Sequence, residues 1–253
     1  MRPLNKLKAG DTLPSGIIIQ ETYKPYGDAG VPLKESIGGY CSYCEVFSSD
    51  LQIEHIISKS QDRTKVSLWD NFLLSCAKCN DKGNKTDKDV VFKSQTYNNG
   101  TPKLVFDNLY LPHLNNTLLA FEYREAGFIA INPNLNDEQK QKAQNTIDLL
   151  GLDKYPDNPK YPRINPRDER HEYRRKAWEF AINYLEEFEQ KKHTATNIAC
   201  FAAQRGFFSV WFTVFKDHNE VKKALIEAFI GTCSACFDAT NNYQPLWRNP
   251  NDL

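Results

Sequence analysis

The chain has 253 residues, and its 32 lysines and arginines balance 32 aspartates and glutamates, so the formal net charge at pH 7 is zero. This balance argues against a protein that gathers nucleic acid through a strongly positive overall field. An odd number of cysteines, seven, favours free thiols and metal ligands in a reducing cytoplasm over a disulfide framework. Apolar stretches fall well short of the ~20 residues that cross a bilayer, so we predict a cytoplasmic protein with no membrane partner.

Residues 1–35 are predicted to form an N-terminal arm. They mix proline, glycine and lysine with one apolar run, Ile17–Ile19. Turn-forming residues at this density disfavour long helices and strands. We expect the arm to be extended, adding a strand or wrapping around a neighbouring element.

Two Cys-x-x-Cys pairs follow, Cys41 with Cys44 and Cys76 with Cys79. Two such pairs can place four thiolates around one tetrahedral zinc ion, which leaves no position for water. The sequence therefore predicts a structural Zn²⁺ site. Any catalytic residues must lie in the connection between the pairs or beside it.

That connection carries polar residues in a strand-like setting. The stretch Leu51–Ile57 holds Glu54 and His55, and a second short strand is expected at Phe72–Leu74, directly after Asn71. A neutral imidazole with a pKa near ~6.5 can take a proton from water at neutral pH. The segment is therefore a candidate for hydrolytic chemistry.

After the second strand, a helix is expected to open around Ala77 and to hold Asn80. The carboxylate of Glu54 and the amide oxygen of Asn80 are hard ligands that suit Mg²⁺ or Mn²⁺. Two short strands and one helix would make this a zinc-stapled unit with a separate catalytic cation.

Residues 91–155 are predicted to extend the unit. Apolar patterning predicts strands at Phe121–Tyr123 and Phe128–Ile131, and then a helix over Asp137–Leu150 that Gly151 ends.

Three prolines between residues 155 and 162 form a linker, and the main domain boundary is predicted there. We thus predict an arm at 1–35, a zinc-bearing domain with its extension at 36–155, and a helical domain at 156–253. The fold class is α+β, with a mainly α-helical C-terminal region.

The helical domain is predicted from periodicity. Four apolar residues recur at helical spacing: Trp178, Ala181, Leu185 and Phe188. They indicate one long amphipathic helix, and two further helices are expected at Thr196–Phe215 and Asn219–Phe237. Together these helices would form a bundle.

Three features of this region have two interpretations each. The basic cluster Lys160–Lys176 could contact nucleic acid or an acidic partner, or form a solvated helix face. The aromatic segment Phe207–Phe215 could be core or a partner interface. Cys233 and Cys236 lack a second pair, and we expect two buried free thiols there in place of a redox or metal site.

The two cysteine pairs, the Glu54-His55 dipeptide and the asparagines at 71 and 80 resemble the HNH, or ββα-metal, endonucleases. Within them the chain is most similar to the PtuB-like nuclease subunit of Septu-type antiphage defence. This narrower resemblance extends over Leu111–Thr117 and Leu149–Asp153, and so covers residues 35–153. It implies a metal-dependent endonuclease, with DNA as substrate, that works beside an ATPase subunit of SMC or ABC type (PtuA-like).

The resemblance also implies a role for each residue. His55 would be the general base, and Asn71, at the middle position of the family motif, would hold its ring. Glu54 and Asn80 would bind the catalytic Mg²⁺ or Mn²⁺.

Lys82 or Lys85, just past Asn80, would hold a flanking phosphate of the substrate. Two positions depart from the commonest family pattern. Glu54 stands where aspartate is frequent, and Ser58 stands where proline is frequent, so the cation site would be looser and the following loop less fixed.

Two alternatives to a DNA endonuclease remain open. The same site could cleave RNA, for example a tRNA, because the chemistry falls on the phosphate and not on the sugar. The chain could also be a catalytically inactive zinc-stabilised module that binds nucleic acid or protein.

Overall fold

In the computed structural model, residues 1–80, 90–96, 100, 102–161 and 168–248 are described. Within these ranges the strands pair into four antiparallel two-stranded sheets. The pairs are β1 (Gln52–His55) with β2 (Phe72–Ser75), β3 (Lys93–Thr96) with β4 (Pro102–Val105), β5 (Phe121–Arg124) with β6 (Phe128–Ile131), and β7 (Phe237–Asp238) with β8 (Gln244–Pro245). Mixed helices and small sheets agree with the predicted α+β class.

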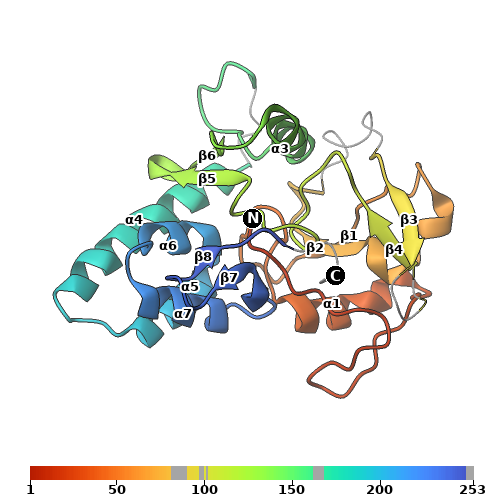
Figure 1. Cartoon of the computed structure of the whole chain (residues 1–253). Helices are drawn as coiled ribbons and strands as arrows, with labels where there is room; N and C mark the ends of the chain where they lie inside the picture. Colours follow the sequence, from red (N-terminus) through yellow and green to blue (C-terminus); the bar gives the residue numbers. More distant parts are fainter. Residues whose placement is uncertain (81–89, 97–99, 101, 162–167, 249–253) are drawn as a thin grey trace.

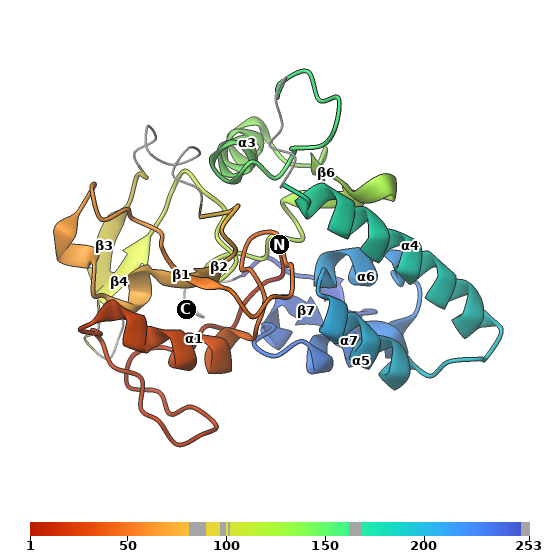
Figure 2. The same cartoon turned by 180° about the vertical axis from the view of Figure 1, so that it is seen from behind.

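The α-helices of the described ranges are α1 (Gly30–Ile37), α3 (Asp137–Leu150), α4 (Arg170–Glu189), α5 (Ala195–Arg205), α6 (Phe208–Val214) and α7 (Asn219–Ala228). Short 3-10 turns lie at η1 (Tyr26–Ala29), η2 (Arg63–Lys65), η3 (Trp69–Asn71), η4 (Glu125–Gly127) and η5 (Ser234–Cys236). In Figures 1 and 2 the β1–β2 and β3–β4 pairs lie on one side of the molecule with α1, and α4–α7 lie on the other.

The β1–β2 hairpin confirms the two strands expected around the candidate site. Gln52 pairs with Ser75, and His55 pairs with Phe72 at the other end of the register. All four residues of β2 are buried, so this strand is enclosed on two faces. The hairpin therefore presents the Glu54-His55 dipeptide from a fixed part of the core.

The β5–β6 hairpin and helix α3 also match the prediction. Helix α3 begins at Asp137 after the N-cap Asn136, whose side chain forms a capping box with Gln139. It ends at Leu150, where Gly151 adopts the left-handed conformation (φ 58°) that stops a helix without a Cβ clash.

The prediction of a single helix over Thr196–Phe215 is wrong, because the helix is interrupted between α5 and α6. Gly206 (φ 82°) approaches the segment after the first cysteine pair so closely that a Cβ there would lie 2.9 Å from the backbone nitrogen of Phe47. Phe207 is also left-handed (φ 60°), and its N–H donates to the carbonyl of Glu45 (3.0 Å). A long-range contact thus interrupts a locally helical pattern.

The helix predicted over Asn219–Phe237 is too long, since α7 ends at Ala228. Gly231 has φ 76°, and a Cβ there would lie 2.5 Å from the Cα of Ile37. This close approach to the end of α1 requires a turn instead of a helix.

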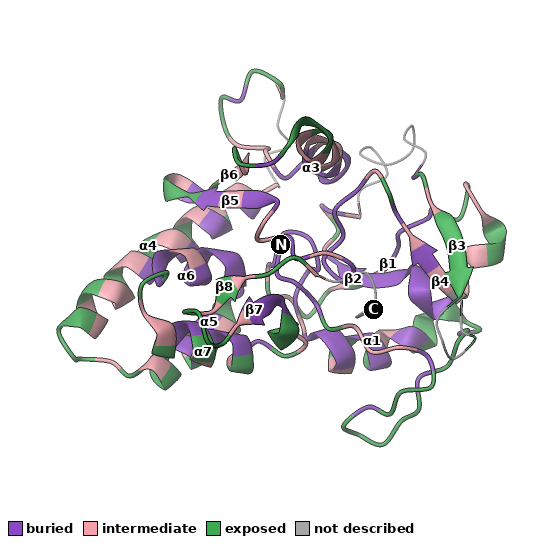
Figure 3. Cartoon of the chain, viewed as in Figure 1, coloured by how far each residue is buried: buried purple, intermediate pink, exposed green. Residues whose placement is uncertain are grey.

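Cys233 and Cys236 are buried and form no disulfide, as predicted, although they lie at the 3-10 turn η5 and not in an α-helix. The aromatic segment 207–215 is core: Phe208, Trp211 and Phe215 are each fully enclosed. Figure 3 shows α6 buried, whereas β3 faces solvent.

The first residues of the arm lie between the two sides of the molecule. The N–H of Leu4 donates to the carbonyl of Pro112 (2.7 Å). The buried guanidinium of Arg2 donates to the carbonyls of Ile37 (2.8 Å) and Phe229 (2.9 Å). These bonds join the arm to elements near both ends of the chain.

In the part of the chain that the structure describes, no helix combines the length and the apolar character needed to cross a bilayer.

Candidate active site and metal centre

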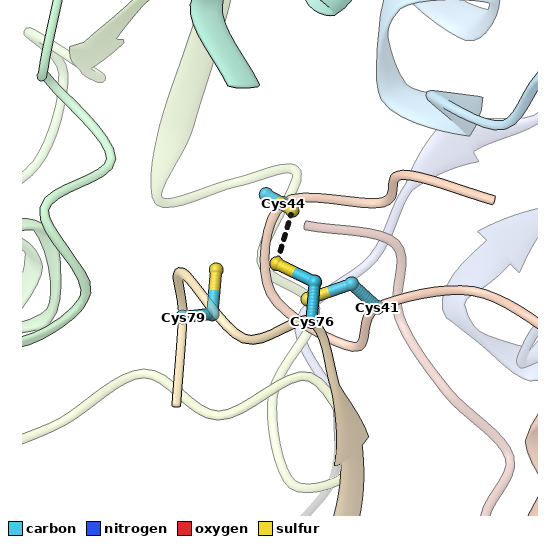
Figure 4. A group of neighbouring side chains, drawn as sticks. All are labelled: Cys41, Cys44, Cys76 and Cys79. Carbon is cyan, nitrogen blue, oxygen red and sulfur yellow. Dashed lines mark hydrogen bonds between the residues drawn. The ribbon is translucent and has the colours of Figure 1, made fainter. Parts of the chain in front are cut away.

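The four cysteines of the two pairs come together as predicted. Cys41 and Cys44 lie in the knuckle before β1, and Cys76 and Cys79 follow β2 (Figure 4). Their sulfur atoms all lie within 4.8 Å of one another, and those of Cys44 and Cys76 are 3.6 Å apart. Tetrahedral zinc with Zn–S bonds of about 2.3 Å places its sulfurs about 3.8 Å apart. The cluster could therefore hold a structural Zn²⁺.

The crowding of four thiols explains why this cluster suits a cation. Hydrogen bonds from the thiols of Cys41, Cys44 and Cys79 hold the pKa of Cys76 far below its usual value. Hydrogen bonding to Cys41 in turn raises the pKa of Cys44, and burial raises that of Cys79. The thiols oppose one another's ionisation, and a bound divalent cation removes this conflict by binding all four as thiolates.

Two buried arginines of α4 add positive charge beside the thiols. Arg170 donates from one guanidinium nitrogen to the sulfur of Cys79 (3.2 Å) and pairs with Asp168 (2.7 Å). Burial opposes its charge, but the interactions with Asp168, Cys79 and Cys44 outweigh burial and raise the pKa of Arg170. Arg174, 2 % exposed, donates to the carbonyl of Gly127. The helical region thus contacts the metal centre directly.

The knuckle is also tied to α6. Glu45, which follows Cys44 in a left-handed conformation (φ 68°), accepts bonds from the backbone N–H (2.8 Å) and the hydroxyl (2.5 Å) of Ser209. A buried carboxylate needs such donors. They fix the first cysteine pair against the helices.

His55 lies at the end of β1, where it is 9 % exposed. Its Nε2 is 2.9 Å from the carbonyl oxygen of Val66. A carbonyl oxygen can only accept, so we assign the ring proton to Nε2, which leaves the lone pair on Nδ1. This tautomer is the one that a general base acting through Nδ1 requires.

The surroundings of His55 favour its neutral form. Its ring makes edge contacts with Tyr26 (centroids 4.9 Å apart) and Phe72 (5.1 Å). Burial lowers the pKa of His55, and the charge of Lys59 lowers it further, whereas the bond to Val66 acts in the opposite direction. The imidazole is therefore unprotonated at neutral pH.

Asn71 was expected to hold the imidazole, but its amide bonds elsewhere. Its Oδ1 accepts from the N–H of Ile57 (2.7 Å), and its Nδ2 donates to the carbonyls of Ile57 (3.0 Å) and Lys65 (3.1 Å). These bonds close the loop that joins β1 to η3. Because Lys65 precedes Val66, Asn71 orients the ring indirectly, by fixing the backbone that supplies its partner.

Glu54 and Asn80, the expected cation ligands, lie on β1 and beside the first residue of β1, respectively. Glu54 is fully buried and, at spacing two from Gln52, shares a strand face with it. Asn80 donates from Nδ2 to Oε1 of Gln52 (3.0 Å), so its carbonyl oxygen lies on the other side of the amide. A carboxylate and an amide oxygen are the ligand types that Mg²⁺ and Mn²⁺ prefer, and in this structure both oxygens of the Glu54 carboxylate are enclosed by protein.

The lysines expected to contact a phosphate of the substrate follow Asn80 in the sequence. Lys82 and Lys85 lie outside the described residues, as does most of the helix expected after Ala77. Up to Asn80 the chain forms a turn, in which the N–H of Asn80 donates to the carbonyl of Cys76 (3.0 Å).

Sequence reasoning missed several residues that contact this site but lie outside the motif. Val66 contributes through its backbone, which no residue pattern reveals, and Tyr26 reaches His55 from the arm. Arg170 and Arg174 were grouped with a basic cluster that has two proposed roles. A signal existed for them, since arginines spaced i, i+4 on one helix share a face, but only the fold shows that this face is buried.

An HNH endonuclease family model matches residues 39–86. The matched segment contains the four cysteines, β1, β2 and Asn80, which are the parts of the site just described. This match supports an HNH nuclease domain at that place in the chain. No curated protein matches the chain.

Proposed function

We propose that the chain is a metal-dependent HNH endonuclease that hydrolyses phosphodiester bonds. The observation that carries the proposal is the pinned imidazole: Val66 holds Nε2 of His55, so Nδ1 is available to take a proton from water. The neighbouring Glu54 and Asn80 would hold the catalytic cation.

Each residue then has a separate task. His55 removes the proton of the attacking water, and Asn71 keeps the loop closed so that the ring stays in place. The thiolates of the four-cysteine centre hold a structural Zn²⁺, which fixes the ends of the hairpin. When bound, Mg²⁺ or Mn²⁺ supplies positive charge next to the phosphate oxygens and the leaving group.

The substrate and setting are proposed from the resemblance and the charge. We propose DNA as the polymer and antiphage defence as the role, with this chain as the nuclease subunit beside an SMC-type or ABC-type ATPase. The zero net charge supports a partner that contributes nucleic-acid affinity. Seven free cysteines support a reducing compartment such as the cytoplasm.

The test compares wild-type protein with His55→Ala on plasmid DNA and total RNA, with Mg²⁺ or Mn²⁺, alone and with any ATPase that co-purifies. His193→Ala is the matched control, because His193 pairs with Glu187 on the far helices. We expect wild type and His193→Ala to cut DNA, and His55→Ala to be at least ~100-fold slower. Equal cutting by His55→Ala would refute the assigned base.

The same experiment separates the alternatives. Cutting of RNA alone would replace DNA as the polymer. Zinc content measured on each protein shows whether the centre is intact. An intact protein that cuts neither polymer in any mixture would favour the zinc-stabilised binding module.

A further inference from the structure

A cleft of about 560 Å³ lies between the cysteine centre and the helices. One wall comes from residues 46–48, which follow the first cysteine pair, and from residues 76–78, which lie within the second pair. The other wall comes from α4, and the end of α5 adds Gln204 and Arg205 at its edge. Cys76 and Arg170 of the four-cysteine centre form part of its lining, but no role assigned above concerns the open space or its other residues.

Three aromatic rings that face solvent line the cleft. Phe47 is 50 % exposed, Tyr173 is 42 % exposed and Phe180 is 37 % exposed. Folded proteins seldom gather exposed aromatic rings at one concave place unless the place binds something. Flat exposed rings are the surfaces on which unpaired bases stack.

Cations lie beside these rings. Lys78, Lys176 and Arg205 line the cleft, and the guanidinium of Arg205 lies 5.2 Å from the centre of the Phe180 ring. Two acids, Asp50 and Glu169, also line it, and Glu169 accepts a bond from the hydroxyl of Tyr173 (2.8 Å).

Three cations of the lining, Lys78, Lys176 and Arg205, face its two acids, and the charge of the buried Arg170 is already paired with Asp168. In a chain with zero net charge, this local excess combined with aromatic rings matches the chemistry of single-stranded nucleic acid.

The cleft adjoins the residues proposed to bind the catalytic cation. Asp50 and Lys78 each lie two residues from the hydrogen-bonded pair of Gln52 and Asn80. The four Cα-to-Cα steps from Asp50 to Glu54 can span at most about 14 Å. A strand whose phosphate lies at Glu54 can therefore reach the cleft within a few nucleotides.

We propose that this cleft binds an unpaired stretch of the nucleic-acid substrate that flanks the scissile phosphate. The bases stack on Phe47, Tyr173 and Phe180, and the phosphates contact Lys176 and Arg205. The proposal deepens the nuclease function proposed above and rests on it for the identity of the ligand. On this proposal, the chain itself selects substrates that have an unpaired strand beside the cleavage site.

The test measures equilibrium binding in the His55→Ala protein, so that cleavage cannot remove the probe. Fluorescein-labelled 20-nucleotide DNA, the same sequence as RNA, and a blunt DNA duplex are titrated and followed by anisotropy. We expect Tyr173→Ala to weaken single-strand binding by about tenfold, since stacking of one base contributes about that much. Trp247→Ala, which removes an exposed ring elsewhere, should leave binding unchanged.

The charged residues give a second readout. Replacing Lys176 and Arg205 by alanine should lower the slope of log Kd against log salt by about 1.4, because each single-strand phosphate contact contributes about 0.7. The matched control replaces Lys191 and Lys223, which are exposed lysines outside the cleft. In this control, the slope of log Kd against log salt should stay within about 0.3 of the slope of the His55→Ala protein.

Failure of this proposal differs from failure of the nuclease function. If wild type cuts nucleic acid while the Tyr173 variant and the Lys176/Arg205 variant bind single strands as the controls do, the cleft proposal is wrong and the nuclease stands. Photocrosslinking of 5-iodouridine oligonucleotides checks the result independently. Crosslinks at Phe47, Tyr173 or Phe180 support the cleft, and crosslinks confined to other segments overturn it.

Discussion

The proposed role of His55 as a base depends on both ring nitrogens, Nδ1 and Nε2. The carbonyl of Val66 accepts a hydrogen bond from the N–H of Nε2, and burial disfavours the imidazolium. Each effect prepares Nδ1 to accept a proton. The proposed role of His55 as a base therefore depends on a backbone carbonyl eleven residues later, which fixes its tautomer.

The pH dependence of cleavage follows from this arrangement. Protonated His55 cannot accept a proton, so cleavage should fall as pH falls through the pKa of His55 and should be constant above it. Because burial lowers that pKa, we expect the midpoint to lie below pH ~6.5. The measurement is kcat/KM between pH 4.5 and 8.5 at saturating metal. A midpoint well above pH ~6.5 would contradict a buried neutral base.

Lys59 provides a control for the cause of the lowered pKa. Its charge opposes protonation of His55, so Lys59→Ala should move the midpoint to slightly higher pH. Lys59→Arg keeps the charge and should not move it. The shift should shrink in high salt, because Lys59 is exposed.

Asn71 offers a prediction about stability. Asn71→Ala leaves the buried N–H of Ile57 and the carbonyls of Ile57 and Lys65 without their partner. We expect a loss of about 2–4 kcal/mol in the free energy of unfolding, together with slower cleavage. Urea unfolding measures the first effect. The exposed Asn134→Ala should change stability by less than about 0.5 kcal/mol, and an equally small change at Asn71 would show that its bonds do not hold the loop.

At the scale of elements, local sequence patterns predicted the helices and strands but missed where some of the helices end. The hairpin β1–β2 and helix α3 follow from apolar alternation, a cap and a terminal glycine, all within a few residues of each other. The end of α5 does not. It is set by the approach of Gly206 to Glu45 and Phe47, and no pattern local to residues 196–215 contains that information.

Gly206 tests this explanation. Gly206→Ala forces a side chain into a left-handed position (φ 82°) and against the backbone of Glu45, so we expect a loss of at least about 2 kcal/mol in unfolding free energy. Gly27→Ala is the control, since nothing lies within 4 Å of its added Cβ. Thermal and urea unfolding compare them. Similar stability of the two variants would mean that the break between α5 and α6 has another cause.

At the scale of the whole molecule, the cysteine centre joins segments that are far apart in the sequence. Its thiols come from the two sides of the β1–β2 hairpin, and α4 in the helical region supplies Arg170. Glu45 adds the contact with α6. The sequence identified the four ligands because their spacing is local, but the arginine that contacts them is 91 residues from Cys79. The centre is thus a structural joint between the hairpin and the helices.

This joint should be measurable as coupling between zinc and α4. Arg170→Met removes the guanidinium from Cys79 and leaves the buried Asp168 without its partner, so we expect zinc to bind about 10–100-fold more weakly, as for other residues that contact metal ligands. Arg170→Lys keeps a positive charge but loses the planar guanidinium. Its zinc affinity should therefore lie between that of wild type and that of Arg170→Met. Competition with a chromogenic chelator measures the affinity.

Arg175→Met is the matched control, because Arg175 lies on the same helix and pairs with Glu172 at the surface. If α4 is held by the centre, chelation of zinc should lower the thermal midpoint of wild type, and the Arg170 variants should lose part of that zinc-dependent stabilisation. Arg175→Met should retain it. An Arg170→Met protein that folds and binds zinc as tightly as Arg175→Met would show that the helix and the metal centre are independent, and that the bond between Arg170 and Cys79 does not stabilise the site.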